Sequence, residues 1–263
     1  MQYLKSFALL AISFIACFHT TGGIVSAAVS QPLQTSTATA TPNPQARRLC
    51  FDQSKVFWFK NSSAIQNFQV VSCAQGIKVE NNQLVLQQLN SNCGGTLMYP
   101  NYIRQGGMWD MQMQVAPSQG IISAFCLYGQ EILTGGKADE LDYEVSNLTP
   151  QIAQSMYYVK GERVLGDEYQ YNIKTPDQQI FSNTKHIYGI EYNQDYVNWW
   201  MDGQIRRTVY KGVRNKFPAD VGLLRFGVWD GSASSGAWAG TVSDWSRGPF
   251  NMYIDWIRFT PYC

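Results

Sequence analysis

The chain has 263 residues, of which 45% are hydrophobic and 15% charged, and its formal net charge is +1. This balance excludes an intrinsically disordered chain, which combines low hydrophobicity with high net charge, and it lacks the basic excess of a nucleic-acid-binding protein. Aromatic residues make up 14% of the chain. They favour either a β-rich fold, because aromatic side chains are enriched in strands, or a binding cleft lined with rings.

The first 48 residues are predicted to precede the folded domain. Residues 1–27 combine one Lys, a short apolar run and small residues before Ala27, which is typical of a secretory signal peptide. The apolar run is too short to span a bilayer comfortably, and we expect no membrane span elsewhere. Residues 28–48 are rich in Ser, Thr and Pro, which predicts a linker. Its last two residues, Arg47 and Arg48, are either a dibasic processing site or a solvated pair. We therefore expect a secreted protein of the extracellular space or cell wall.

Secretion makes disulfides the expected state of the cysteines. The cysteines that follow the signal segment are Cys50, Cys73, Cys93, Cys126 and Cys263. Five is an odd number, so at least one of them is outside any disulfide. Because the ends of a domain often meet, Cys50 is a natural partner for Cys263. Cys73 and Cys93 form a plausible second pair across a hairpin, although spacing alone does not fix the pairing. No CxxC spacing indicates a metal site, and we expect neither a metal nor a cofactor.

From Leu49 onward the sequence reads as a series of short strands. Asn81-Asn82 and Asp202-Gly203 mark hairpin turns. Residues 108–115 alternate between apolar and polar side chains, and residues 120–129 form a nearly continuous apolar run that fits a central strand. We find no amphipathic helix longer than two turns. The fold class predicted for 49–263 is all-β, a jelly-roll sandwich of two antiparallel sheets with a concave substrate cleft.

Two Asn-x-Ser/Thr triplets are candidate N-glycosylation sites on a secreted surface. They begin at Asn61 and Asn147.

Residues 139–144, "DELDYE", place three acids on one strand. Glu140, Asp142 and Glu144 share one face because side chains alternate, and such close like charges are unfavourable unless something uses them. The Cα atoms of the two glutamates lie about 13 Å apart, and inward-leaning side chains leave a gap of roughly 5 Å, which suits the carboxyl pair of a retaining glycosidase. Asp142 lies between them and helps to keep one glutamate protonated. The alternatives are a solvated face or a calcium site.

The acidic strand matches the ExDxE signature of glycoside hydrolase family 16, a family of β-jelly-roll enzymes acting on β-glucans and related polysaccharides. The surrounding segments resemble the fungal Crh-type (Congo red hypersensitive) cell-wall transglycosylases, which link chitin to β-glucan. In chain order the similar segments are "GIISAFCLYG", "KADELDYE", "AQSMYYVKG", "KHIYGIEYNQDYVNWWMDGQIRRTV", "VWDGSASSGAWAG" and "RGPFNMYIDWIRF".

The resemblance implies a role for each acid: Glu140 as the nucleophile, Glu144 as the general acid and then base, and Asp142 as the group that assists them. It implies a retaining glycosidase or transglycosylase that cleaves chitin or β-glucan and passes the chain to a glucan acceptor. The alternatives are a plain endo-β-glucanase or chitinase, a non-catalytic sugar-binding jelly roll, and a structural wall protein. The expected partner is the polysaccharide, and we expect a monomer.

Sugar rings stack on aromatic side chains, so large rings in loops are candidate platforms. Trp229 and Trp238 fall in a Gly/Ser-rich stretch and are predicted to line the cleft, with Tyr157 or its neighbour Tyr158 as a further contact. Gln154 is a candidate polar contact. It begins Gln-Ser-Met where the Crh-like relatives carry Gln-Thr-Asn, which leaves sugar specificity open.

Other conspicuous side chains are predicted to be structural. Trp199, Trp200 and Trp256 fall within strands, and His186 is expected to pack or to form hydrogen bonds.

Overall fold

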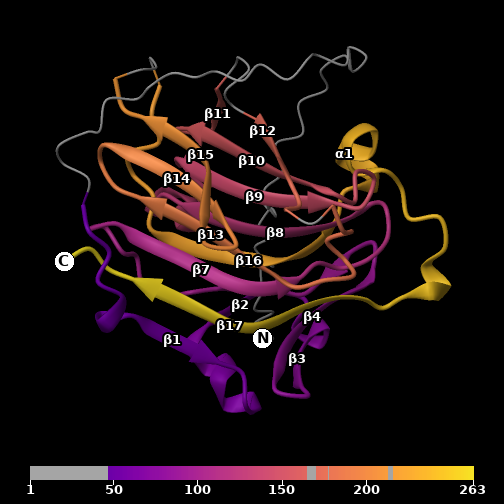
Figure 1. Cartoon of the computed structure of the whole chain (residues 1–263). Coiled ribbons are helices and arrows are strands. Elements are labelled where there is room, and N and C mark those ends of the chain that lie inside the picture. The colour runs from indigo at the N-terminus through magenta and orange to yellow at the C-terminus, as the bar shows by residue number, and fades with distance from the viewer. Residues whose placement is uncertain (1–46, 165–169, 177, 213–215) are drawn as a thin grey trace, which may run out of the picture.

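The computed structural model describes residues 47–263, apart from 165–169, 177 and 213–215. The predictions for the segments 1–27 and 28–46 lie outside these residues. Two antiparallel sheets stack face to face, with a few short helices at the edges (Figure 1), which confirms the predicted all-β jelly-roll sandwich. Among the described residues, no helix is long and apolar enough to cross a membrane.

We name the two sheets after a central strand of each. The β7 sheet consists, in spatial order, of β15 (Gln204–Tyr210), β14 (Tyr196–Met201), β13 (His186–Tyr192), β7 (Gly107–Gln114), β17 (Phe250–Thr260), β4 (Gln83–Asn90) and β3 (Ile77–Glu80), with β1 (Lys55–Trp58) beside β17 and β5 (Cys93–Gly94) beside β4. The β9 sheet consists of β11 (Glu162–Arg163), β10 (Ile152–Val159), β9 (Glu140–Ser146), β8 (Ile121–Tyr128), β16 (Leu223–Asp230), β6 (Thr96–Met98) and β2 (Gln69–Ser72), with β12 (Gln170–Lys174) beside β10.

Short helices lie between these strands. They are the 3-10 helices η1 (Phe51–Gln53), η2 (Ser62–Asn67), η3 (Ala74–Gly76), η4 (Gln130–Thr134) and η5 (Trp245–Arg247), and the α-helix α1 (Ser232–Ala239).

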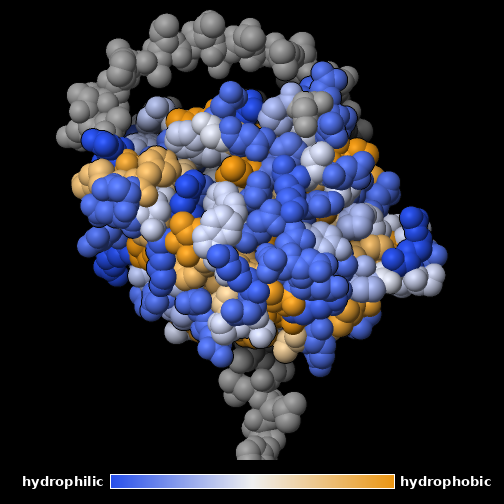
Figure 2. Space-filling model, turned by 60° about the horizontal axis from the view of Figure 1, so that its bottom comes forward, coloured by the Kyte–Doolittle hydropathy of each residue, from blue (hydrophilic) through white to orange (hydrophobic). Residues whose placement is uncertain are grey.

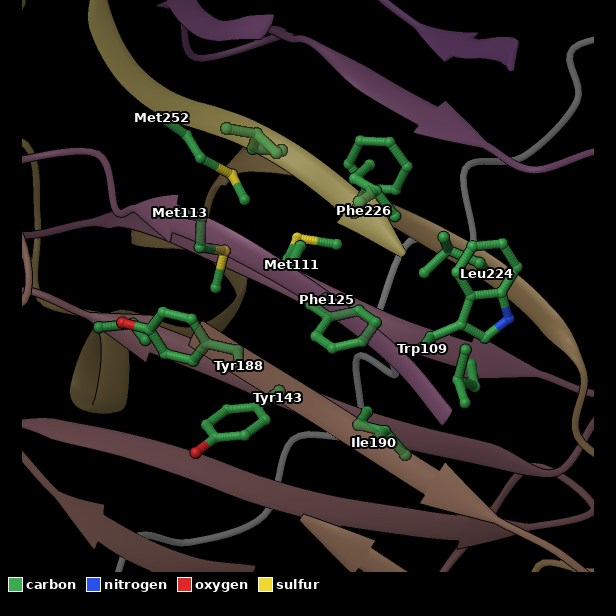
Figure 3. Packing of buried hydrophobic residues seen from close by; sticks show 14 of the residues in the cluster. Trp109, Met111, Met113, Phe125, Tyr143, Tyr188, Ile190, Leu224, Phe226 and Met252 are labelled. Atoms are coloured by element: carbon green, nitrogen blue, oxygen red, sulfur yellow. The ribbon is translucent and has the colours of Figure 1, made fainter. Parts of the chain in front are cut away.

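The core fills the space between the sheets, where both contribute every second side chain (Figure 3). Trp109, Met111 and Met113 of β7 are fully buried there, as the alternation in 108–115 predicts. From the facing sheet come side chains such as Tyr143 and Phe125. Side chains alternate across a strand. The β9 residues next in sequence to these core residues therefore point out of the outer face of the β9 sheet.

The two predicted hairpins are present, and their turns show why the sequence marks them. Asn81 and Asn82, between β3 and β4, have φ of 52° and 60°; Asp202 and Gly203, between β14 and β15, have φ of 50° and 76°. Asn, Asp and Gly adopt such left-handed backbone more readily than other residues. The turns therefore fix the register of the strands that they join.

The stretch after β16 was expected to be a loop, and it forms the short helix α1 instead. Ser and Gly are weak helix formers, so tertiary contacts must hold it. The Ala239 carbonyl accepts a hydrogen bond of 2.9 Å from Ser146 Oγ at the end of β9 and one of 2.8 Å from Gly120 N. The helix is thereby attached to the strand that carries the acids.

Both expected cysteine pairs form disulfides. Cys50 is joined to Cys263 and Cys73 to Cys93, with 213 and 20 residues separating the partners. The first disulfide joins the two ends of the domain. Next to it, Leu49 and Tyr262 form an isolated antiparallel β-bridge through their backbones. Cys126 is buried in β8 and belongs to neither disulfide.

The two disulfides are expected to differ in their contribution to stability. A cross-link restricts the unfolded chain more when it closes a longer loop, so loss of the Cys50–Cys263 bridge should cost about 5 kcal/mol and loss of Cys73–Cys93 about 3 kcal/mol. Thermal unfolding of Cys263→Ser and Cys93→Ser beside the unaltered protein measures this. Equal losses, or a larger loss in Cys93→Ser, would contradict the loop-closure argument.

Candidate active site

The three acids of β9 point away from the core, while Leu141 and Tyr143 between them point into it. The exposed fractions of Glu140, Asp142 and Glu144 are only 5%, 1% and 5%. The acids are therefore on the outward face, as predicted, yet they are almost completely removed from bulk water. This is an environment in which at least one carboxyl group is pushed towards its neutral form.

Neighbouring strands supply the side chains that shield the acids. On β8, Tyr128, Cys126 and Ala124 lie directly opposite Glu140, Asp142 and Glu144, and on β10 the corresponding residues are Tyr158, Met156 and Gln154. The floor around the acids is thus largely apolar. Buried Met98, Ala124, Cys126, Tyr128 and Leu223 form a cluster of their own, separate from the main core.

This environment acts most strongly on Glu144. Burial, followed by the negative charge of Glu140, raises the pKa of Glu144 to about 8, while a hydrogen bond with Trp229 acts in the opposite direction. At neutral pH Glu144 therefore retains its proton. Its Oε1 atom is buried and has no hydrogen-bond partner among the described residues. A carboxyl group that keeps its proton at neutral pH is what a general acid requires.

Trp229 and Trp238, the two predicted ring platforms, lie together at one side of the acids. Their ring centroids are 6.3 Å apart with the planes inclined by 33°, and both side chains are half-buried. Trp229 comes from β16 and Trp238 from α1. The Nε1 atom of Trp238 is buried and, within the described part of the chain, makes no hydrogen bond.

The β10 predictions are partly corrected. Gln154 faces the same side as the acids, opposite Glu144, and its buried Oε1 has no hydrogen-bond partner in the described residues. Tyr157, in contrast, is fully buried in the main core, beneath the guanidinium of Arg207 at 5.5 Å, so the prediction that it binds substrate is wrong. Its neighbour Tyr158 faces the acids, and its pKa is raised by burial and by the charges of all three.

Comparison with known proteins identifies the family. The sequence profile of Glycosyl hydrolases family 16 matches residues 64–258. The chain belongs to this family.

Two curated relatives illustrate the range within the family. Over 160 residues the chain is 31% identical to Crh-like protein 5 of Aspergillus fumigatus, covering 58% of this chain and 38% of the relative. It is 32% identical over 161 residues to a beta-glucanase of Fibrobacter succinogenes, covering 60% of this chain and 44% of that one. The chain thus spans less than half the length of these relatives.

Solved structures agree on the fold. The Crh5 transglycosylase in complex with NAG superimposes with a TM-score of 0.69 at 23% identity, covering 79% of this chain and 84% of that one. The Bacillus licheniformis beta-glucanase gives a TM-score of 0.64 at 20% identity, over 78% and 97% of the two chains.

A pocket of about 320 Å³ lies next to the acids. Ala124 and Cys126 of the floor and Trp229 line it, together with Arg225 and Gln88. Sequence reasoning missed these floor residues, because the apolar run 120–129 reads as a strand buried in one core. The strand is in fact buried on both faces, with Phe125 and Leu127 in the main core and Cys126 and Tyr128 beside the acids.

The remaining predicted residues of the family 16 domain lie outside the cleft. His186 is buried and forms hydrogen bonds with Asp202 Oδ2 at 2.8 Å and Thr184 Oγ1 at 2.9 Å, which agrees with a structural role. The candidate glycosylation site Asn61 is exposed at the start of η2. Asn147 is half-buried and donates a hydrogen bond to the Ala116 carbonyl. In the described residues no group of three His, Cys, Asp or Glu side chains is arranged to hold a metal ion.

Replacing Trp229 by Phe is expected to move the alkaline limb of the pH–activity profile upward. The hydrogen bond from Trp229 lowers the pKa of Glu144, so its removal lets burial and Glu140 raise that pKa further, while the ring remains as a platform. The pH dependence of kcat/KM for Trp229→Phe beside the unaltered protein is the measurement. A limb that stays in place or moves down would show that the bond does not control Glu144.

Proposed function

We propose that this protein is a secreted retaining glycosidase and transglycosylase that acts on β-linked cell-wall polysaccharides. The observation that supports this most directly is the buried acid pair, in which the pKa of Glu144 is raised to about 8 beside Glu140. Two such carboxyl groups serve different purposes: the ionised one attacks and the protonated one donates. The resemblance of the acidic strand to the family signature implies the same assignment, and both glutamates lie within the matched residues 64–258.

In the proposed reaction Glu140 attacks the anomeric carbon of the donor sugar, and the bond between that carbon and the bridging oxygen breaks. Glu144 gives its proton to the departing oxygen. The first product leaves and a glycosyl ester on Glu140 remains. Glu144, now ionised, takes the proton from an incoming hydroxyl group, whose oxygen displaces Glu140 and restores both carboxyl groups. Asp142, between the two, is the residue that assists them in the arrangement implied by the family resemblance.

Transfer and hydrolysis differ only in whether the incoming hydroxyl belongs to a sugar or to water. The residues next to the acids include Cys126, Ala124 and Met156, so part of this floor offers no strong hydrogen-bonding group to a water molecule. The rings of Trp229 and Trp238 supply a surface on which a sugar can lie. Both features favour a sugar acceptor, and the named transglycosylase among the structural neighbours is consistent with that preference.

A transfer assay tests the proposal. Soluble chitin or chitin oligosaccharides serve as donor and fluorescent laminari-oligosaccharides as acceptor, with Glu140→Gln in parallel. We expect labelled products longer than the acceptor, absent with the variant. Shortened donors alone would indicate a hydrolase, as the name of the Fibrobacter succinogenes relative suggests for that protein. A folded protein that binds polysaccharide but yields no product from chitin or β-glucans would leave a sugar-binding module.

A further inference from the structure

A second groove lies on the outer face of the β7 sheet, on the side of the sandwich opposite the acids. It encloses about 570 Å³ between the end of β1, the β3–β4 turn and the middle of β17. Trp58 pairs with Trp256, which pairs in turn with Gln112. The neighbours of Gln112, Met111 and Met113, point into the core, so Gln112 and the two tryptophans must point outward. We call this the outer groove.

One wall of the outer groove is aromatic. Trp58 is 54% exposed, and its ring centroid lies 6.5 Å from that of the half-buried Trp256, with the planes inclined by 56°. The Arg258 guanidinium lies 5.2 Å from the Trp256 ring centroid and supports it. Trp256 was expected to be structural because it lies in a strand, yet the register turns it outward. Two adjacent outward-facing indoles form a contiguous apolar patch, and such a patch rimmed by polar residues is typical of a ligand-binding groove.

Carboxamides make up much of the remaining lining. They belong to Asn81, Asn82, Gln83 and Gln112, and among the described residues the side chains of Asn81, Asn82 and Gln112 make no hydrogen bond. The groove lining carries three charged side chains, Lys60, Lys185 and Asp255. Lys185 Nζ and Gln83 Nε2 donate hydrogen bonds to Asp255 Oδ1 at 2.9 and 2.6 Å, so Lys185 and Asp255 neutralise each other and Lys60 is the remaining charge. Figure 2 turns the bottom of the Figure 1 view, where β1 and β3 lie, towards the reader, and this surface is mostly hydrophilic with small hydrophobic patches.

We propose that the outer groove binds a neutral β-linked hexopyranose chain and holds the enzyme on insoluble wall polysaccharide while the cleft acts on another chain. Such a chain offers flat C–H faces for Trp58 and Trp256 to stack on, and hydroxyl or acetamido groups for the carboxamides. A nucleic acid or an acidic peptide would require a positive field, and one lysine without an ion-pair partner in the described part of the chain does not provide one. The identity of the polymer rests on the proposed function.

The test separates the groove from the cleft. The fraction of protein retained on insoluble β-1,3-glucan and on chitin particles reports the groove, and kcat/KM for a soluble oligosaccharide reports the cleft. Trp58→Ala combined with Trp256→Ala should weaken retention about tenfold, because two stacking contacts are lost, and should leave kcat/KM unchanged. Trp58→Phe should retain binding. The matched control is Tyr210→Ala, which removes a ring that is 38% exposed outside the groove; its retention should equal that of the unaltered protein.

Retention by the double variant equal to that of the unaltered protein on both particles would overturn the proposal. So would a fall in sedimentation coefficient with unchanged retention, because the groove would then join two copies of the chain. Failure of the proposed function is distinguishable: an unaltered protein that processes no oligosaccharide but shows Trp58-dependent retention would refute the catalytic proposal and support the groove. If the unaltered protein is retained more strongly on β-1,3-glucan particles than on chitin particles, or the reverse, that difference identifies the polymer that the groove binds.

Discussion

Glu140→Gln is expected to abolish catalysis while leaving the fold intact, with kcat reduced on the order of 10⁴-fold, because the covalent step has no nucleophile. Gln has nearly the same shape as Glu, and the substitution removes a charge from a site that is only 5% exposed. Thermal stability should therefore be equal to or greater than that of the unaltered protein. The measurements are the initial rates of transfer and donor cleavage, beside a thermal melt of the same samples.

Two further variants make the assignment of the nucleophile specific. Glu140→Asp keeps the charge but withdraws the carboxylate by about one carbon–carbon bond, so a small residual activity should remain. Glu140→Ala leaves space for azide, which should attack the anomeric carbon from the same side and yield a glycosyl azide of inverted configuration. Azide rescue that yields only the retained configuration, or full activity of Glu140→Gln, would rule Glu140 out as the nucleophile.

The sequence alone predicts the structure correctly where side chains alternate regularly along a strand or where a turn requires particular residues. The alternation in 139–146 places Glu140 and Glu144 on one face and Tyr143 on the other, and that is their arrangement in β9. Asn81-Asn82 and Asp202-Gly203 define hairpins because few other residues adopt positive φ. These local rules depend on one strand or one turn, so they can be read without knowing which strands become neighbours.

The sequence was insufficient where the face of a residue depends on a partner strand. Residues 153–159, "AQSMYYV", do not alternate cleanly, so only the register with β9 decides that Tyr158, opposite Glu140, faces the acids and Tyr157 does not. The same limit applies to β17, where a register shift between Ile254 and Trp256 turns Trp256 outward. Long-range pairing, rather than local preference, sets both outcomes.

Glu144→Gln is expected to remove the alkaline limb of activity. The pKa of Glu144 is raised to about 8, so in the unaltered protein the proton donor is lost, and activity falls, as pH rises through that value. Gln cannot donate a proton of this kind, and the rate for unactivated polysaccharide should drop roughly 10²- to 10⁴-fold. A donor with a good leaving group, such as a nitrophenyl glycoside, needs little protonation and should be affected far less in its first step.

The same raised pKa makes a prediction about stability that is independent of catalysis. Between the ordinary value of 4.5 and about 8, the folded protein holds a proton on Glu144 that the unfolded chain releases. The free energy of unfolding therefore falls as pH rises through this window. Glu144→Gln removes that slope, so its melting temperature should exceed that of the unaltered protein at pH 8 and approach it at pH 4.5. Glu80→Gln, with a side chain 52% exposed, is the control for removing a glutamate from the surface. If Glu144→Gln melts below the unaltered protein at pH 8, burial of the ionised carboxylate does not destabilise the fold, and the basis for calling Glu144 the acid is lost.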